Sequence, residues 1–242
     1  MKNKVTLFGK IIGIVFCIAV FFSAIKAQKA PTPPVPKPKS AQPTAPGPKK
    51  TNQRPPIKPS KNKLSANAFE KATVEMMGGQ CVKFETEAGL IEFEMYPESA
   101  PESVRGFLNL TASGAFDTTT FNRVVKDFII QGGDLTTREK LTPELSVLSR
   151  KTIPDEPNLI KHEHGILSMA RTDSPNSATT SFFILVGQAK HLDGTFAAFG
   201  HVTRGIEIVE TINKMPLDGE KPIKPVRIIR ATVALCPAAA AQ

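Results

Sequence analysis

The sequence predicts a mainly β domain, a barrel with two helices, in the part of the 242-residue chain that follows residue 72. Three observations predict this fold class. Short segments of alternating apolar and polar residues recur from residue 81 to residue 235. Turn residues separate these segments, and only two stretches have the apolar spacing of a helix. Many strands with two helices are typical of a barrel.

The N-terminus has the composition of a targeting segment. Three lysines precede an uncharged apolar run over residues 11–25, and Ala24 and Ala27 supply the small residues of a cleavage site. A spanning helix needs about 20 apolar residues, so the run is an anchor only if the apolar residues before it extend it. We expect residues 1–27 to be a signal peptide or an N-terminal membrane anchor, with membrane attachment through residues 5–25 in the second case.

Residues 28–72 are expected to be a disordered linker. Residues 26–63 contain eleven of the 21 prolines and ten Lys or Arg, with no aromatic residue. Such a segment cannot offset the entropy cost of folding, and it favours extended polyproline conformations. Of the 31 basic residues, 13 lie in residues 1–63, which contain no Asp or Glu, leaving 18 basic against 22 acidic residues from Leu64 onward. The positive charge therefore belongs to this arm, and we do not expect nucleic acid as a partner.

The predicted domain begins with a β-hairpin and a helix. Residues 81–86 and 90–95 alternate between apolar and polar side chains on either side of a turn that contains Gly89. Residues 99–110 have Pro101 in the first turn and apolar residues spaced for one helical face. Three further strands, a second helix and a closing strand are expected at residues 165–170, 181–186, 197–202, 205–213 and 226–235.

The most informative stretch is residues 121–134, which read FNRVVKDFIIQGGD. In a strand, alternation places Phe121 and Arg123 on one face, so apolar side chains flank an arginine. Taken alone, the pattern favours an ordinary half-buried strand with an outward arginine. The identity of the whole run, together with two later blocks, changes this interpretation.

Three blocks lie in order along the predicted domain. The blocks are F-x-R-V-x-x-x-F-x-I-Q-G-G-D at 121–134, GILSMA at 165–170 continuing to SFFI at 181–184, and HLDG at 191–194 continuing to Phe199 and Gly200. In this order and spacing they resemble the cyclophilin family of peptidyl-prolyl cis-trans isomerases. The resemblance extends from about Cys81 to Cys236, and residues 171–178 resemble the bacterial branch in particular.

The resemblance implies a closed eight-stranded antiparallel β-barrel capped by two α-helices. We assign this domain to residues 73–237 and expect a disordered tail at residues 238–242. The implied reaction needs no cofactor and no metal, and we expect a monomer. Proline-containing polypeptides are the implied partners.

The chemistry explains why such residues are needed. Rotation of an X–Pro amide loses its resonance across a barrier of about 18–20 kcal/mol, so a catalyst must bind the twisted amide better than either planar form. Arg123 matches the catalytic arginine of the family, whose guanidinium is thought to hydrogen-bond the prolyl nitrogen. Phe128 and Gln131 are implied to share the catalytic site. The implied substrate-binding residues are Phe121, Ile129, Ala170, Arg171, Ser181, Phe183, His191, Leu192 and Phe196.

Several positions depart from the family pattern. Ser181 stands where glutamine is common, which shortens a backbone contact, and Phe196 stands where histidine or tyrosine is frequent. His191 occupies the place of the tryptophan that cyclosporin-sensitive members use, so we expect weak inhibition by that drug. Residues 135–145 replace a glycine-rich segment and indicate a short charged helix or an irregular insert.

Two further pairs of residues need an interpretation. The family topology pairs the first strand with the last, so Cys81 and Cys236 could form a disulfide, with two unrelated buried thiols as the alternative. His162 and His164 alternate and could bind a metal from one side of a strand. No carboxylate or cysteine cluster accompanies them, so we expect exposed polar residues there.

The sequence therefore predicts an exported peptidyl-prolyl cis-trans isomerase of the periplasm or cell envelope that assists the folding of exported proteins. One alternative is a proline-peptide-binding or chaperone module of the same fold, with Ser181 and Phe196 marking weak or absent catalysis. In another alternative, the basic proline-rich arm carries the main function of the protein, and the domain is only attached to it.

Overall fold

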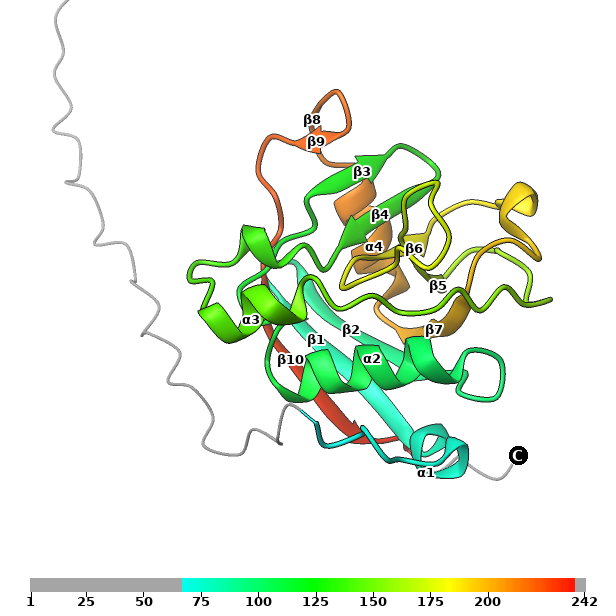
Figure 1. Cartoon of the computed structure of the whole chain (residues 1–242). Helices are drawn as coiled ribbons and strands as arrows, with labels where there is room; N and C mark the ends of the chain where they lie inside the picture. Colours follow the sequence, from blue (N-terminus) through cyan, green and yellow to red (C-terminus); the bar gives the residue numbers. More distant parts are fainter. Residues whose placement is uncertain (1–66, 238–242) are drawn as a thin grey trace, which may run out of the picture. The chain divides into compact units, whose positions relative to one another are not determined.

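The computed structural model describes residues 67–237 of the chain (Figure 1). The expected signal peptide or anchor at residues 1–27, the expected membrane attachment through residues 5–25, most of the expected linker and the expected tail lie outside the described residues. Within the described part, no helix has the length and apolar character needed to cross a bilayer. The folded part begins before residue 73, because Phe69 and Ala72 are buried in the core.

A single eight-stranded sheet forms the centre of the domain (Figure 1). Its strands follow the order β10-β1-β2-β7-β5-β6-β4-β3, and every neighbouring pair is antiparallel. The strands are β1 (Gln80–Thr86), β2 (Gly89–Met95), β3 (Arg123–Val125), β4 (Ile129–Gly132), β5 (Ile166–Met169), β6 (Phe182–Leu185), β7 (Ala198–Arg204) and β10 (Ile228–Leu235).

The expectation of a closed barrel is wrong, because the sheet curls into a half-barrel. Within residues 67–237, no ladder joins β3 to β10, and the two ends of the sheet are linked by the isolated bridge between Thr120 and Arg227. β3 has only three residues, and the main-chain N–H of Val124 donates to the carbonyl of Glu220 over 2.8 Å. The loop that contains Glu220 therefore forms this hydrogen bond at the edge of β3, and β10 does not pair with that edge.

The two predicted helices are present as α2 (Pro101–Ala112) and α4 (Ile206–Asn213). Ala100 cannot cap α2 with its side chain, and the Glu156 carboxylate replaces it by accepting from the main-chain N–H groups of Glu102 and Ser103 over 2.9 and 2.8 Å. α4 begins after Gly205, whose φ of 85° favours glycine. α2 packs on β10 and β7, whereas α4 packs on β2 and β4.

Several short elements complete the fold. The segment predicted as a short charged helix or irregular insert begins with a 3-10 turn that buries Leu135. It continues into a short helix that has no buried residue. The short elements are α1 (Val74–Gly78), η1 (Leu135–Thr137), α3 (Pro143–Leu148), η2 (Lys190–Leu192), β8 (Leu217–Asp218) and β9 (Lys221–Pro222).

Phenylalanine rings fill the space between the sheet and α2. Phe182 of β6 lies 5.3 Å from Phe107 of α2, centroid to centroid, with the rings edge to face. Phe84 and Phe116 contact both of these rings at 5.1–6.0 Å. Offset and edge-to-face aromatic contacts add to the free energy gained by burial, so this cluster holds α2 on the sheet.

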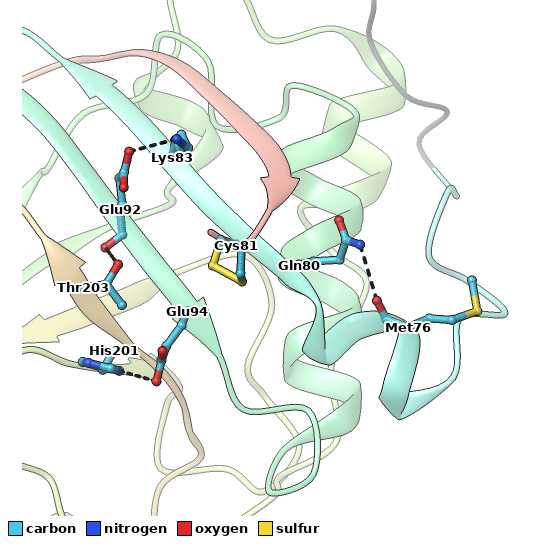
Figure 2. Close-up of a disulfide and its surroundings, with 9 residues drawn as sticks. Met76, Gln80, Cys81, Lys83, Glu92, Glu94, His201 and Thr203 are labelled. Carbon is cyan, nitrogen blue, oxygen red and sulfur yellow. Dashed lines mark hydrogen bonds and ion pairs between the residues drawn. A yellow bond between two sulfur atoms is a disulfide. The ribbon is translucent and has the colours of Figure 1, made fainter. Parts of the chain in front are cut away.

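Of the two alternatives left open for Cys81 and Cys236, a disulfide or two unrelated thiols, the structure contains the disulfide. Cys81 in β1 is joined to Cys236, which follows β10, with an S–S distance of 2.08 Å (Figure 2). The two strands pair antiparallel with Cys81 opposite Ala234, and the Cys236 N–H donates to the Gly79 carbonyl over 3.0 Å. The bridge thereby links the first strand in the chain, β1, to the end of the last strand, β10.

Candidate active site

The candidate site is built on the short hairpin of β3 and β4. Arg123 and Gln131 are direct cross-strand partners, and Arg123 Nη1 donates to Gln131 Oε1 over 3.2 Å. Arg123 Nε donates to Glu220 Oε2 over 2.7 Å. The Arg123 side chain is 44 % exposed, so the guanidinium is held in place and still reaches solvent.

A buried asparagine holds the turn of this hairpin. The Asn213 side chain, at the end of α4, donates to the carbonyls of Val125 and Ile129 over 2.8 and 3.1 Å. Its Oδ1 accepts from the N–H of Asp127, which has a φ of 55°. Three hydrogen bonds from one buried side chain therefore fix the turn that leads from Arg123 to Phe128. Sequence patterns alone do not reveal this role of Asn213, because its three partners lie more than 80 positions away in the chain.

A second apolar cluster lies beside the arginine and is separate from the main core. Phe183 of β6 pairs directly with Gln131, so the aromatic ring and the amide come from adjacent strands. The cluster can offer an apolar surface to a proline ring, because half of its members are only partly buried. Its buried members are Ile129, Phe183, Leu185, Ala189 and Leu192, and its partly buried members are Val125, Phe128, Ile166, Ala170 and Phe196.

Aromatic and charged side chains surround this apolar cluster. Phe128 stacks on His191 with 5.8 Å between ring centroids, and Phe183 meets Phe196 edge to face at 6.1 Å. The Arg171 guanidinium lies 4.6 Å from the Phe196 ring centroid, a cation–π contact. The structure thus brings most of the predicted substrate-binding residues together around one patch.

The strand edge next to the cluster is shaped by Ala170 and Ser181. The Ala170 N–H donates to the Ser181 carbonyl over 3.0 Å, so these two predicted residues lie together at the ends of β5 and β6. Both are partly exposed. Arg171 follows Ala170, and its Nε lies 3.9 Å from Asp155 Oδ1.

Phe121 is the exception among the predicted site residues. Its side chain is fully buried in the main core, where it lies edge to face with Phe182. Phe121 also precedes β3, which begins at Arg123, so the expectation that Phe121 and Arg123 lie on one face of the same strand is wrong. In this structure Phe121 cannot touch a peptide and instead packs behind the strand that carries Arg123.

The expectation that His162 and His164 are both exposed is half wrong. His164 is exposed, but His162 is 1 % exposed, and its Nδ1 lies 3.3 Å from Asp193 Oδ1. Its Nε2 faces the Ser168 hydroxyl over 3.2 Å. Burial lowers the pKa of His162, while the hydrogen bond to Asp193 opposes this shift. Ser168 is fully buried, so this Asp-His-Ser arrangement presents no nucleophile and anchors the loop that carries Leu192.

Among residues 67–237, no three His, Cys, Asp or Glu side chains are grouped so that they could hold a metal ion. A cavity of about 100 Å³ lies elsewhere, where α2 faces residues 148–154. Arg105, Asn109 and Ile153 are among its lining residues. None of the predicted site residues lines it, so we place the candidate site at Arg123 and the apolar cluster.

Comparison with known proteins agrees with this geometry. The family model described as cyclophilin type peptidyl-prolyl cis-trans isomerase/CLD matches residues 81–233, more than half of the chain. The chain belongs to the cyclophilin family. The matched range contains Arg123, Gln131 and every member of the apolar cluster.

Relatives of this cyclophilin come from eukaryotes and bacteria. It is 38 % identical over 157 residues to peptidyl-prolyl cis-trans isomerase cypE of Dictyostelium discoideum, covering 64 % of this chain and 99 % of the relative. It is 32 % identical over 180 residues to a peptidyl-prolyl cis-trans isomerase of Acinetobacter baylyi, covering 70 % of this chain and 89 % of the relative. These matches do not favour the bacterial branch over the eukaryotic members.

A solved structure shares the fold of this cyclophilin. It is a cyclophilin type peptidyl-prolyl cis-trans isomerase of Cryptosporidium parvum, crystallised in the presence of the dipeptide Ala-Pro. The TM-score is 0.56 at 31 % identity, and the match covers 64 % of this chain and 98 % of the other. The relatives are named as isomerases, so the family activity is the cis-trans isomerisation of peptidyl-prolyl bonds.

Proposed function

We propose that this cyclophilin accelerates the isomerisation of X–Pro bonds with Arg123 as the catalytic hydrogen-bond donor. The observation that carries the proposal is the position of the guanidinium. It is held by Gln131 and Glu220 next to an apolar cluster that contains Phe128, Phe183 and Leu192. A fixed donor beside an apolar surface is the arrangement that favours a twisted prolyl amide over a planar one.

The proposed mechanism needs neither a nucleophile nor a proton transfer. The apolar cluster binds the proline ring, and the preceding peptide group lies over Arg123. As the C–N bond twists, resonance is lost and the prolyl nitrogen regains a lone pair, which can accept a hydrogen bond from the guanidinium. This bond is stronger in the twisted state than in the planar states, so it lowers the barrier. Arginine keeps its charge throughout the working pH range.

The remaining site residues have supporting roles in this proposal. Gln131 positions the peptide carbonyl and orients Arg123, whereas Ile129, Phe183 and Leu192 contact the proline ring. Ala170, Arg171 and Ser181 contact the peptide backbone at the strand edge, and His191 and Phe196 border the ring site. These roles are supported by the positions of the residues, because each belongs to the apolar cluster or contacts it at its edge.

We also propose that the protein acts outside the cytoplasm, in the periplasm or cell envelope, as a monomer that assists the folding of exported proteins. The support is the lysine-flanked apolar run before residue 28 and the basic, proline-rich segment that follows it. Membrane attachment through residues 5–25 belongs to this proposal. The disulfide between Cys81 and Cys236 is consistent with an oxidising compartment.

The test is isomerisation of a short Ala-Pro peptide by the full chain, measured by NMR exchange or by a protease-coupled assay. We expect catalysis in the wild type and a fall in kcat/KM on the order of a hundredfold for Arg123→Ala, the usual cost of losing a preorganised donor. Arg204→Ala is the matched control, because Arg204 is an exposed residue at the end of β7.

Peptide binding without turnover would contradict the proposal. It would favour the binding or chaperone module that Ser181 and Phe196 suggest. The NMR experiment separates these outcomes directly, because chemical shifts report binding and exchange between the cis and trans signals reports catalysis.

A further inference from the structure

The hairpin of β8 and β9 places a carboxylate against the candidate catalytic arginine. Glu220, in the turn between the two strands, accepts from Arg123 Nε over 2.7 Å. The two residues are 97 positions apart in the chain. Figure 1 shows β8 and β9 projecting beside β3, where the hydrogen bond from Val124 to the Glu220 carbonyl joins them.

Two hydrogen bonds that do not involve the Glu220 side chain attach this hairpin to the sheet. The Val124 N–H donates to the Glu220 carbonyl over 2.8 Å, and Lys126 Nζ donates to the Met215 carbonyl over 2.8 Å. Neither bond uses the Glu220 carboxylate, and the Glu220 side chain is 56 % exposed. Removal of the carboxylate should therefore leave the hairpin in place.

We propose that Glu220 is a positioning residue that orients Arg123 for the isomerase reaction. The inference rests on the proposed function of Arg123. An arginine side chain can adopt many rotamers, so an exposed guanidinium with one partner would sample several positions. Glu220 holds one edge of the guanidinium through Nε, and Gln131 accepts from Nη1.

This arrangement leaves the third nitrogen for the substrate. Within residues 67–237, Arg123 makes side-chain hydrogen bonds through Nε and Nη1, and none is formed by Nη2. A planar guanidinium that is hydrogen-bonded through two of its nitrogens presents its remaining N–H groups in a fixed direction. The hydrogen bond and charge of Arg123 lower the pKa of Glu220, so the carboxylate is ionised at neutral pH.

The proposal predicts a graded response to substitution at Glu220. Glu220→Ala leaves Arg123 with one partner, and we expect kcat to fall about tenfold with KM changed less than about twofold, because misplacement of a catalytic group mainly affects the transition state. Glu220→Gln keeps an acceptor oxygen and should restore a large part of kcat. Asp218→Asn is the matched control, since Asp218 is an exposed carboxylate on the same hairpin.

A double-mutant cycle with Arg123 separates positioning from other roles. If Glu220 acts through Arg123, Glu220→Ala has no further effect on kcat/KM in an Arg123→Ala background. If Glu220 instead contacts the peptide directly, the two losses multiply. The NMR signal of the Arg123 Nε–H gives an independent readout, because loss of the 2.7 Å hydrogen bond should shift and broaden it in Glu220→Ala.

The outcomes distinguish the two proposals. An active wild type with a Glu220→Ala variant of unchanged kcat would overturn the positioning role and leave the isomerase function intact. Multiplicative losses in the cycle would also overturn it. A folded wild type without isomerase activity would refute the proposed function itself, and the Nε–H signal would still report whether Glu220 holds Arg123.

Discussion

Arg123 and Gln131 are direct partners across the β3–β4 hairpin, and their side chains are joined by a hydrogen bond of 3.2 Å. Cross-strand partners on one face of a sheet have closely spaced Cβ atoms, so the pairing register itself brings the guanidinium and the amide together. A shift of one residue in this register would turn Gln131 to the other face.

Replacement of Gln131 by leucine should lower kcat/KM about five- to tenfold, because a hydrogen bond to a charged group contributes roughly 1.5–3 kcal/mol when buried and less when exposed. The same peptide isomerisation assay measures this loss. Gln80→Leu is a suitable control, since Gln80 lies at the start of β1 beside the disulfide (Figure 2). Equal losses for both variants would contradict the role of Gln131.

Reduction of the disulfide should destabilise the domain. Cys81 and Cys236 are 155 positions apart, so the bridge restricts almost the whole domain in the unfolded state. Loss of a native disulfide costs about 2–5 kcal/mol of unfolding free energy. This loss is measured by urea unfolding of Cys81→Ser and of the wild type, the wild type both with and without reductant. Cys17→Ser in the full chain is the control, because it replaces the one cysteine of the sequence that is not part of this bridge. An unchanged midpoint in Cys81→Ser would refute the prediction.

Tyr96 should lose its proton only at very alkaline pH. Burial raises its pKa to about 12, with a smaller contribution from the charge of Glu94. The unfolded chain releases this proton near its ordinary value of about 10, so Tyr96 stabilises the fold below pH 10 and this contribution is lost as pH rises toward 12.

Ultraviolet absorbance of the phenolate provides the measurement for Tyr96. The chain contains one tyrosine and no tryptophan, so the signal has a single source. The urea-unfolded protein serves as the reference. A folded protein that titrates at the same pH as the unfolded chain would show that the hydroxyl is not shielded, contrary to its 2.7 Å contact with His201 Nδ1.

The buried His162 should make the domain less stable in mild acid. Its pKa is lowered in the folded state, chiefly by burial, so the unfolded chain binds the proton first as pH falls below about 6.5. The contribution of neutral His162 to the free energy of unfolding is therefore full above that pH and decreases below it. The urea midpoint should depend less on pH in His162→Gln than in wild type. A substitution of the exposed His164, His164→Gln, should leave the pH dependence of the midpoint unchanged. A folded His162 that titrates above 6.5 by NMR would contradict this sign.

Cyclosporin should inhibit the isomerase weakly. This expectation rests on the resemblance of the motif around His191 to the family pattern, which has a tryptophan at that position in sensitive members. In the structure His191 is exposed and stacks on Phe128. His191→Trp should increase inhibition by about tenfold or more, because a larger apolar ring buries more surface against the drug. Lys190→Trp, at the neighbouring exposed position, is the control. Strong inhibition of the wild type would disprove the prediction.

Local patterns predicted the secondary structure well where neighbouring residues determine it. The alternation around Gly89 gave β1 and β2, and the proline-led apolar spacing gave α2. The short β8–β9 hairpin has two residues in each strand, too few for a period to be recognised. Closure of the sheet was also predicted wrongly. The hydrogen-bond partner of an edge strand is set by tertiary packing, and the edge of β3 bonds to the β8–β9 turn, with no ladder to β10 among residues 67–237.

The sequence by itself determined the family and most residues of the candidate site, because the three motif blocks within residues 121–134, 165–184 and 191–200 contain them. Only the tertiary structure decided which of them meet. Phe121 was expected at the substrate and lies in the core, and His162 was expected at the surface and is buried. Glu220 meets Arg123 across 97 residues. Periodicity reports the direction of a side chain relative to its own strand, whereas contacts between distant segments depend on how the whole chain packs.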